Sequence, residues 1–183
     1  MKQTIPFRVG NVVNLLYRYQ NNFANPDTGV RRLIPDYDKY DAGAYITGEW
    51  RANDELLLDF GIRYDFNRID AKKFYLKSRW EERGYDEDFS DIIIEEFPTQ
   101  YLTNPIFDYH NISGALGVKY NFNTNNYLLG NYTRSSRAPN PSELFSDGLH
   151  HSAARIEIGD LRIDSERSNR ISGTYGYTSS KLN

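Results

Sequence analysis

Two adjacent histidines, His150 and His151, are the residues in this chain whose types most directly suggest site chemistry. A zinc site needs three or four ligands, and neighbouring side chains in an extended chain point to opposite sides, so the pair alone cannot form one. Glu143 and Asp147 could join a histidine only through folding of the segment around them, and Arg155 follows in the same segment. We therefore take these five residues as candidates for contact with a small-molecule ligand, and metal binding stays open.

Catalytic chemistry finds little support in the sequence. The segment 67–108 is rich in Asp and Glu, which in pairs can hydrolyse glycosidic bonds, but it also contains Lys and Arg, and such mixed charge is typical of a solvated surface. Ser146, His150 and Asp147 supply the residue types of a nucleophilic triad, yet no nucleophile-elbow motif accompanies them. We expect no catalytic residues, no cofactor and no enzymatic activity.

Composition narrows the class of protein that must position these side chains. The 183 residues include 15% aromatic residues, among them 15 tyrosines, and 26% charged residues, a mixture that does not match a disordered chain. The net charge of −3 is too small to indicate a nucleic-acid partner. The chain contains no cysteine, which excludes disulfides and thiolate metal sites, and no apolar run approaches the length of a membrane-spanning helix.

The strongest pattern in the chain is alternation with a period of two, which is typical of β-strands. In 55–66, ELLLDFGIRYDF, one parity is entirely apolar or aromatic, and the other contains Asp59, Arg63 and Asp65. The segment 109–122 alternates in the same way between an apolar face and a small or polar face. The sequence predicts strands near 9–20, 40–51, 55–66, 109–122, 126–137 and 168–180.

The connections between these predicted strands alternate in length. Residues 52–54 and 123–125 form short turns, whereas 21–39, 67–108 and 138–167 are long. Short turns at one end and long external loops at the other are typical of outer-membrane β-barrels. Strands of about 11 residues also suit a tilted membrane crossing, and aromatic residues gather near the strand ends as they do at membrane interfaces. A soluble β-sandwich, whose apolar face points into a core, is the alternative.

We therefore predict an all-β fold, an antiparallel, up-and-down transmembrane β-barrel. Six strands cannot close such a barrel, for which about eight is the smallest number known, so we expect a six-strand segment of a larger barrel and a piece of a longer protein. Its apolar face would contact outer-membrane lipid, and its polar face would line the lumen. The candidates for lumen-facing side chains are Arg18, Glu49, Asp59, Arg63, Asp65 and Lys119.

The residues 140–143, Asn-Pro-Ser-Glu, predict the start of a short helix. Asn suits the N-cap, Pro suits the first helical position, and Glu at the third position completes a capping box. We expect a helix around Ser142–Phe145 that fixes the direction of the chain where it leaves the strand over 126–137.

Several of these segments resemble the TonB-dependent outer-membrane receptors. The stretch YDAGAYITGEWRANDELLLDFGIRYD (Tyr40–Asp65) is similar to a hairpin of that family, and RSSRAP (Arg134–Pro139) resembles its R-x-F-R-A-P segment, with Ser136 in place of the usual aromatic residue. PSELFSDGLHHSAARIEIGD (Pro141–Asp160) resembles the loop that follows. Glu166-Arg167-Ser168 resembles the entry into the next strand, although the preceding residues depart from the family's Asn-Leu-x-Pro-Glu.

The resemblance covers most of 9–180 and implies a barrel of about 22 strands that encloses a plug domain. It further implies partners: the plug domain and an energy-coupling complex of the inner membrane, both reached through parts of the protein that are absent here. The implied function is energy-coupled import of a scarce ligand, such as an iron chelate, haem, a metal or a vitamin, across the outer membrane of a Gram-negative bacterium. A passive porin-like or adhesive outer-membrane barrel is the alternative.

Overall fold

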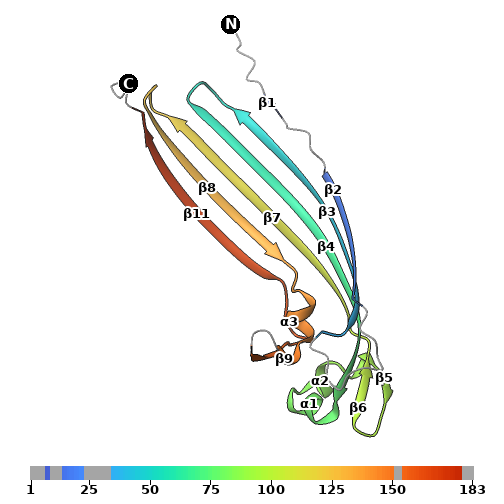
Figure 1. Ribbon diagram of the computed structural model, residues 1–183. Helices are drawn as coiled ribbons and strands as arrows, with labels where there is room; N and C mark the ends of the chain where they lie inside the picture. The colour runs from blue at the N-terminus through green and yellow to red at the C-terminus, as the bar shows by residue number, and fades with distance from the viewer. Residues whose placement is uncertain (1–6, 9–13, 23–33, 151–153, 179–183) are drawn as a thin grey trace.

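The described residues, 7–8, 14–22, 34–150 and 154–178 of a computed structural model, are dominated by one antiparallel sheet (Figure 1). Its wall consists, in this spatial order, of β2 (Asn14–Asn22), β3 (Asp36–Arg51), β4 (Leu56–Leu76), β7 (Ile106–Asn121), β8 (Asn126–Arg137) and β11 (Glu166–Tyr177). The short β1 (Phe7–Arg8) pairs with the end of β3 near Trp50. Neighbouring wall strands follow one another along the chain, so the predicted up-and-down antiparallel order is confirmed.

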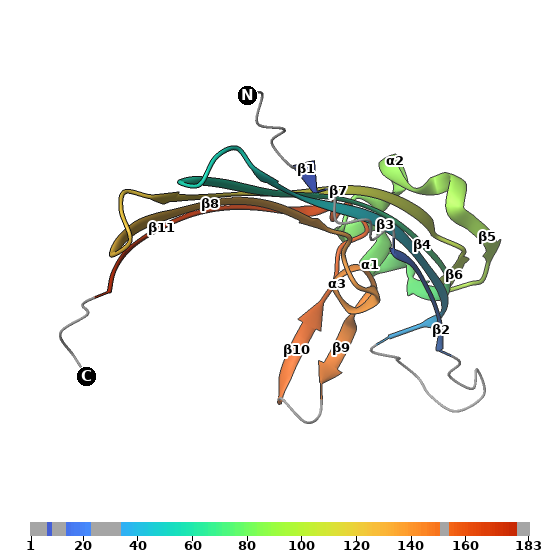
Figure 2. The same cartoon turned by 90° about the horizontal axis from the view of Figure 1, so that it is seen from above.

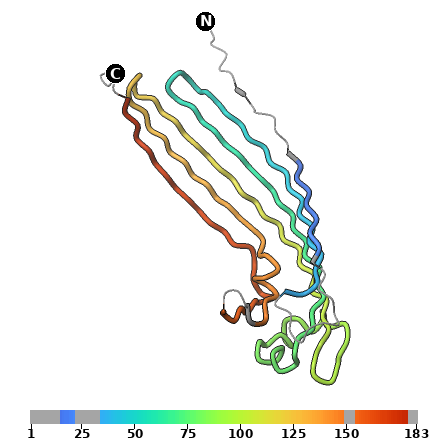
Figure 3. Tube along the Cα trace, in the orientation of Figure 1, coloured from blue at the N-terminus to red at the C-terminus, as the bar shows by residue number. Residues whose placement is uncertain are grey.

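Asparagine side chains close the two short turns between wall strands. Asn53 Oδ1 accepts hydrogen bonds from the backbone N–H groups of Glu55 (2.9 Å) and Leu56 (2.7 Å), which fixes the β3–β4 hairpin. Asn123 does the same for the β7–β8 hairpin, accepting from Asn125 and Asn126 at 2.9 Å each. Both turns lie at the same end of the sheet, opposite the long connections (Figure 3).

The sheet is strongly curved (Figure 2), and the exposed apolar side chains of its wall strands share the convex face. Side chains alternate across it, so Ile46 and its cross-strand neighbour Ile62 share the convex face, with Ile112 beside them. Ile62 is 54% exposed, Ile112 61% and Ile171 83%. A soluble sandwich would bury such a face under a second layer, whereas a barrel wall presents it to lipid. The chain is therefore a segment of a transmembrane β-barrel, and the sheet is not closed within the described part of the chain.

Further elements lie beyond the wall, at the end opposite the short turns (Figure 1). The connection from β4 to β7 contains α1 (Lys77–Glu82), α2 (Tyr85–Asp88), the 3-10 helix η1 (Ser90–Ile92), β5 (Ile93–Glu96) and β6 (Gln100–Thr103). The connection from β8 to β11 contains α3 (Pro141–Phe145), β9 (Asp147–His150) and β10 (Arg155–Ile158). We call the described residues of 77–104 and 138–165 together the loop platform.

Strand β4 continues past Phe66 to Leu76, and its two faces exchange character on the way. Up to Phe66 the convex positions are apolar, but the next convex residues are Arg68, Asp70 and Lys72. On the concave face Ile69, Ala71 and Tyr75 are buried instead, because the loop platform covers them. The predicted strand over 55–66 therefore ends too early, because the apolar series does not stop at Phe66 but moves to the concave face.

The hydrophobic core lies between this upper part of the sheet and the loop platform. Its most buried members come from β4, α1, α2 and the segment around α3, and they are Ile69, Ala71, Tyr75, Trp80, Tyr85, Leu144, Phe145 and Leu161. Figure 2 shows α3 and the β9–β10 hairpin on the concave side of the curved sheet. Within the described residues, no helix has the length and apolar character needed to cross a membrane.

Candidate ligand-contacting site

Three aromatic rings hold the loop platform on the sheet. Tyr75 at the end of β4, Trp80 in α1 and Tyr85 in α2 pack edge to face, with ring centroids 5.2 to 6.0 Å apart. All three are fully buried. Phe145 of α3 stacks on Phe107 of β7, with centroids 6.3 Å apart, and so attaches the second connection to the same core. The platform is thus a packed unit rather than two separate loops.

Arg137, the last residue of β8, binds both the helix that follows and the first residue of β11. Its Nη1 and Nη2 donate to the two carboxylate oxygens of Glu143 at 3.1 and 2.9 Å, a bidentate pair, and its Nε donates to Glu166 Oε2 at 2.8 Å. Glu166 pairs with Arg137 in the β8–β11 register. The second arginine of the RSSRAP segment therefore ties together the strand exit, the helix and the strand re-entry.

The predicted capping box at the start of α3 is confirmed. Asn140 Oδ1 accepts from the backbone N–H groups of Ser142 (3.0 Å) and Glu143 (3.1 Å), and Glu143 Oε2 accepts from the backbone N–H of Asn140 at 2.8 Å. The Arg137 guanidinium, together with this N–H, lowers the pKa of the Glu143 carboxyl below its ordinary value. Glu143 is committed to holding α3 in place.

An ion pair joins the two halves of the loop platform. Arg83 Nη2 lies 3.2 Å from Asp147 Oδ1, and the side chains are only 14% and 9% exposed. Arg83 Nη1 also donates to the carbonyl of Gly159 at 3.3 Å. Nearby, Arg162 Nε donates to Asp88 Oδ2 at 2.6 Å. These bonds cross from the first connection to the second and hold the platform closed over the sheet.

Several buried polar groups lie beneath α3. The Lys73 ammonium donates to the carbonyl of Phe145 and lies 4.6 Å from the centroid of the Tyr75 ring. Tyr75 Oη, Trp80 Nε1 and Ser146 Oγ are buried and make no hydrogen bond to any described residue. Buried polar atoms are normally paired, so these three atoms are exceptions within the described part of the platform.

The candidate ligand-contacting residues have unequal surroundings. Glu143 and Asp147 are occupied by the contacts above, whereas Arg155 is exposed and pairs with Glu157 at 2.8 Å. Arg155 lies opposite His150 in the β9–β10 register, and His151 falls outside the described residues. The part of the chain that the structure describes contains no group of three His, Asp or Glu side chains able to hold a metal ion.

The six residues expected to face the lumen share one face of the sheet. All six lie on the concave side, as the strand register shows: Arg18 pairs with Asp41, Glu49 with Asp59 and Lys119 with Leu57, and Arg63 and Asp65 have the same parity as Asp59. Arg18 Nη2 lies 2.7 Å from Asp41 Oδ2, and Arg63 Nη2 lies 2.6 Å from Asp65 Oδ1. Three of these six charges, those of Arg18, Arg63 and Asp65, therefore have a partner of opposite sign within the wall.

A chain of amide, hydroxyl and carboxylate groups crosses four strands just below the platform, on the concave face of β3, β4 and β7 and then through the gap to β8 where the β7–β8 pairing has ended. Asn67 donates to Asp41 at 2.6 Å, Asn111 donates to Asn67 at 3.2 Å, and Ser136 donates to Asn111 at 2.6 Å. Sequence reasoning missed this network, although Asn67 and Asn111 have the parity of the polar face. It also missed Lys73 and Arg83, which it assigned to a solvated loop.

A family model described as "TonB dependent receptor-like, beta-barrel" matches residues 3–183 of this chain. The chain belongs to this family. The resemblance inferred from the hairpin over 40–65 and from the RSSRAP segment is therefore confirmed. No curated protein and no solved structure matches the chain.

Membership in the TonB-dependent receptor family gives the two faces of the sheet their general meaning. The family comprises receptors and transporters of the outer membrane rather than enzymes, and its barrels work with a plug domain and a TonB-coupled partner. The apolar convex face suits lipid, and the polar concave face, with the platform above it, suits an aqueous interior.

Proposed function

We propose that this chain forms part of the barrel wall of a receptor in the outer membrane of a Gram-negative bacterium. The receptor imports a scarce ligand, such as an iron chelate, haem, a metal or a vitamin, with energy supplied through the inner membrane. The observation that supports this most is the opposition of the two faces: exposed isoleucines such as Ile112 and Ile171 on one, and the ion pairs of Arg18 and Arg63 on the other. A plug domain of the full-length protein would contact the polar face.

The loop platform is the proposed ligand-contacting part. Arg155 is the best-placed of the candidates, because its side chain is 71% exposed on a hairpin that lies on the concave side. His150 lies opposite Arg155 in the β9–β10 register, and His150 and His151 both stay candidates for contact with the ligand. Glu143 and Asp147 would act indirectly, by holding α3 and β9 where a ligand meets the platform.

Transport by the full-length protein tests this proposal. Cells that express it would take up the correct member of a panel of iron chelates, haem, metals and vitamins, and uptake would stop when the inner membrane is de-energised. Uptake that continues without energy would indicate a passive pore instead. A folded chain that stays monodisperse without detergent would contradict the barrel itself.

Arg155→Ala and the histidine substitutions His150→Ala and His151→Ala divide the proposed site further. Each should weaken ligand binding to the full-length receptor while leaving barrel assembly unchanged, because Arg155 is 71% exposed and lies on β10, outside the wall strands. Equal binding by all three variants would place the ligand elsewhere on the receptor.

A further inference from the structure

Two arginines on the convex face, Arg134 and Arg167, have no partner of opposite charge among the residues that the structure describes. Arg134 of β8 pairs in register with Asn169, and Arg167 of β11 pairs with Ser136, so the two arginines are diagonal neighbours on adjacent strands. Neither makes an ion pair with any described residue. Arg68, also on this face, differs because its Nη1 lies 3.1 Å from Asp108 Oδ2. The wall therefore leaves a doubly positive spot uncompensated.

This pair lies at the outer edge of the apolar band. Along the convex face of β8, Leu128 and Tyr132 precede Arg134, and along β11 Ile171 is followed toward the platform by Asn169 and then Arg167. From Asn126, eight residues of a strand tilted by about 40° rise about 20 Å, near the top of an apolar band about 25 Å tall. The hydroxyl of Tyr132 donates to Asn169 Oδ1 at 2.9 Å, as expected at an interface.

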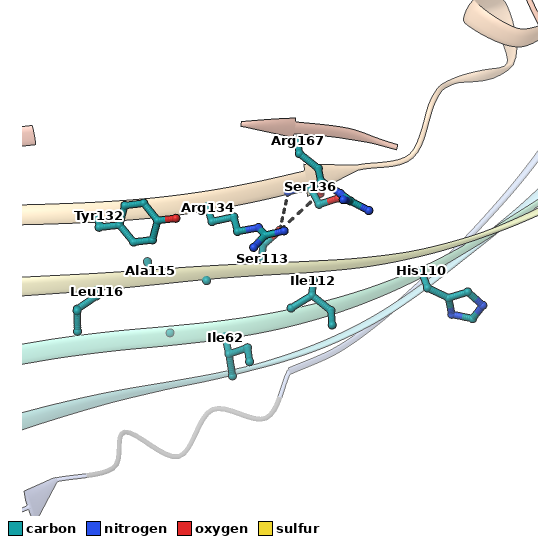
Figure 4. A pocket seen from close by; sticks show the side chains of 12 residues that line it. Ile62, His110, Ile112, Ser113, Ala115, Leu116, Tyr132, Arg134, Ser136 and Arg167 are labelled. Atoms are coloured by element: carbon teal, nitrogen blue, oxygen red, sulfur yellow. Dashed lines mark hydrogen bonds between the residues drawn. The ribbon is translucent and has the colours of Figure 1, made fainter. Parts of the chain in front are cut away.

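A hollow of about 570 Å³ opens beside the two arginines. It forms because the β7–β8 pairing ends at Gly114 and Arg134, while β7 continues to Ile106. Figure 4 shows Ile62, Ile112 and Leu116 along one side of the hollow and the two arginines on the other, toward its platform end. The hollow is thus apolar along the strands and positively charged at its outer end.

We propose that this hollow binds an outer-leaflet glycolipid that bears phosphate. Arg134 and Arg167 contact the phosphate, because a guanidinium matches the geometry of phosphate oxygens and two unpaired cations attract an anion at the membrane surface. An acyl chain lies along Ile112 and Leu116, which are 61% and 48% exposed. The inference rests on the proposed outer-membrane location and assigns the convex face a specific lipid that the transport function does not require.

Lipid binding by the full-length receptor in detergent micelles tests the proposal, with native mass spectrometry as the readout. The probes are a diphosphorylated glycolipid, its dephosphorylated form and inorganic phosphate. We expect the diphosphorylated lipid to bind about fivefold more weakly for each arginine removed, in Arg134→Gln, Arg167→Gln and the double variant. Removing the phosphates from the lipid should produce the same loss in the wild-type protein.

Arg170→Gln is the matched control, because Arg170 is also exposed and lies on β11 but has the opposite parity, on the concave face. It should bind the phosphorylated lipid like the wild type, and Arg134→Lys should retain part of the affinity. Equal binding by the double variant, or displacement of the lipid by millimolar inorganic phosphate, would overturn the assignment. Heat-modifiable gel migration of every variant reports barrel folding separately, so loss of the barrel is distinguishable from loss of the lipid site.

Discussion

Arg83 and Asp147 form an ion pair of 3.2 Å although they lie 64 positions apart in the chain. The pair joins the connection after β4 to the connection after β8, and both side chains are largely buried. Asp147, which the sequence made a candidate for ligand contact, therefore stabilises the loop platform by joining its two connections. A receptor that must keep its external segments ordered before a ligand arrives benefits from such pre-organisation.

Replacing Arg83 by Met should loosen the platform without disturbing the wall. Removal of one partner from a poorly exposed charged hydrogen bond costs about 2 kcal/mol, and the contacts with the Gly159 carbonyl and the Tyr85 ring are lost as well. Limited proteolysis of the folded receptor in detergent should therefore cleave the platform about 30-fold faster. Arg79→Met removes an exposed pair with Glu82 and should change the cleavage rate little.

Gly159 is required by the close approach of two backbone segments. A Cβ at this position would lie 2.6 Å from the carbonyl oxygen of Glu143 and 2.6 Å from the carbonyl carbon of Leu144. Gly159→Ala should therefore displace β10 from α3 and destabilise the platform by about 1–3 kcal/mol. Gly148→Ala, where a Cβ meets nothing within 4 Å, is the control. Amide hydrogen exchange over 141–160 that is the same in both variants would contradict the expectation.

The start of α3 should weaken in acid because Glu143 caps it as a carboxylate. Its pKa is lowered in the folded protein, so its contribution to stability is complete above the ordinary carboxyl pKa of 4.5 and is lost as the pH falls through the lowered value. Amide protection at Ser142 and Glu143 should decline over that range. In Glu143→Gln the decline should be absent; an identical pH dependence in this variant would assign the effect to another group.

The two faces of β7 should respond oppositely to charge. Leu116→Arg places a guanidinium on the convex face, where Leu116 is 48% exposed, and should cost about 2–4 kcal/mol if the position is near the bilayer centre. Ala115→Arg puts the same charge one residue away on the concave face. Outer-membrane assembly, followed by heat-modifiable gel migration, should fail or slow only for Leu116→Arg. Equal assembly of both variants would argue against a lipid-facing convex side.

The wall of the sheet could be predicted from sequence because its signal is local. Alternation over 55–66 and asparagine-rich turns at 52–54 and 123–125 need no information from distant residues. The extension of β4 to Leu76 could not be predicted in this way. Its concave residues are buried because α1, α2 and the segment around α3 fold over them, and a single sequence does not state those contacts.

In the candidate site too, local features could be predicted from sequence and contacts between distant segments could not. The capping box of Asn140 and Glu143 spans three residues and was predictable, whereas the pairing of Arg83 with Asp147 depends on how two connections fold together. The histidines drew attention by residue type alone, and among the described residues no set of three ligands for a metal forms. Residue type alone therefore understated the structural role of the charged residues around 150–151, and ligand contact by the two histidines stays a prediction.

The point at which the convex face stops being apolar differs from strand to strand, and this difference shows how the strands are tilted relative to the membrane. Counted toward the platform, the last apolar or aromatic residue on the convex face of β3 is Tyr40, which pairs with Arg68. In β11 the corresponding residue is Ile171, which reaches Phe60 through Tyr132 and Leu116. The change-over thus shifts toward the short turns from one side of the sheet to the other. A bilayer surface therefore crosses these strands obliquely. The position at which each strand changes from a lipid-facing to a water-facing convex side shows the stagger between strands that a closed barrel requires.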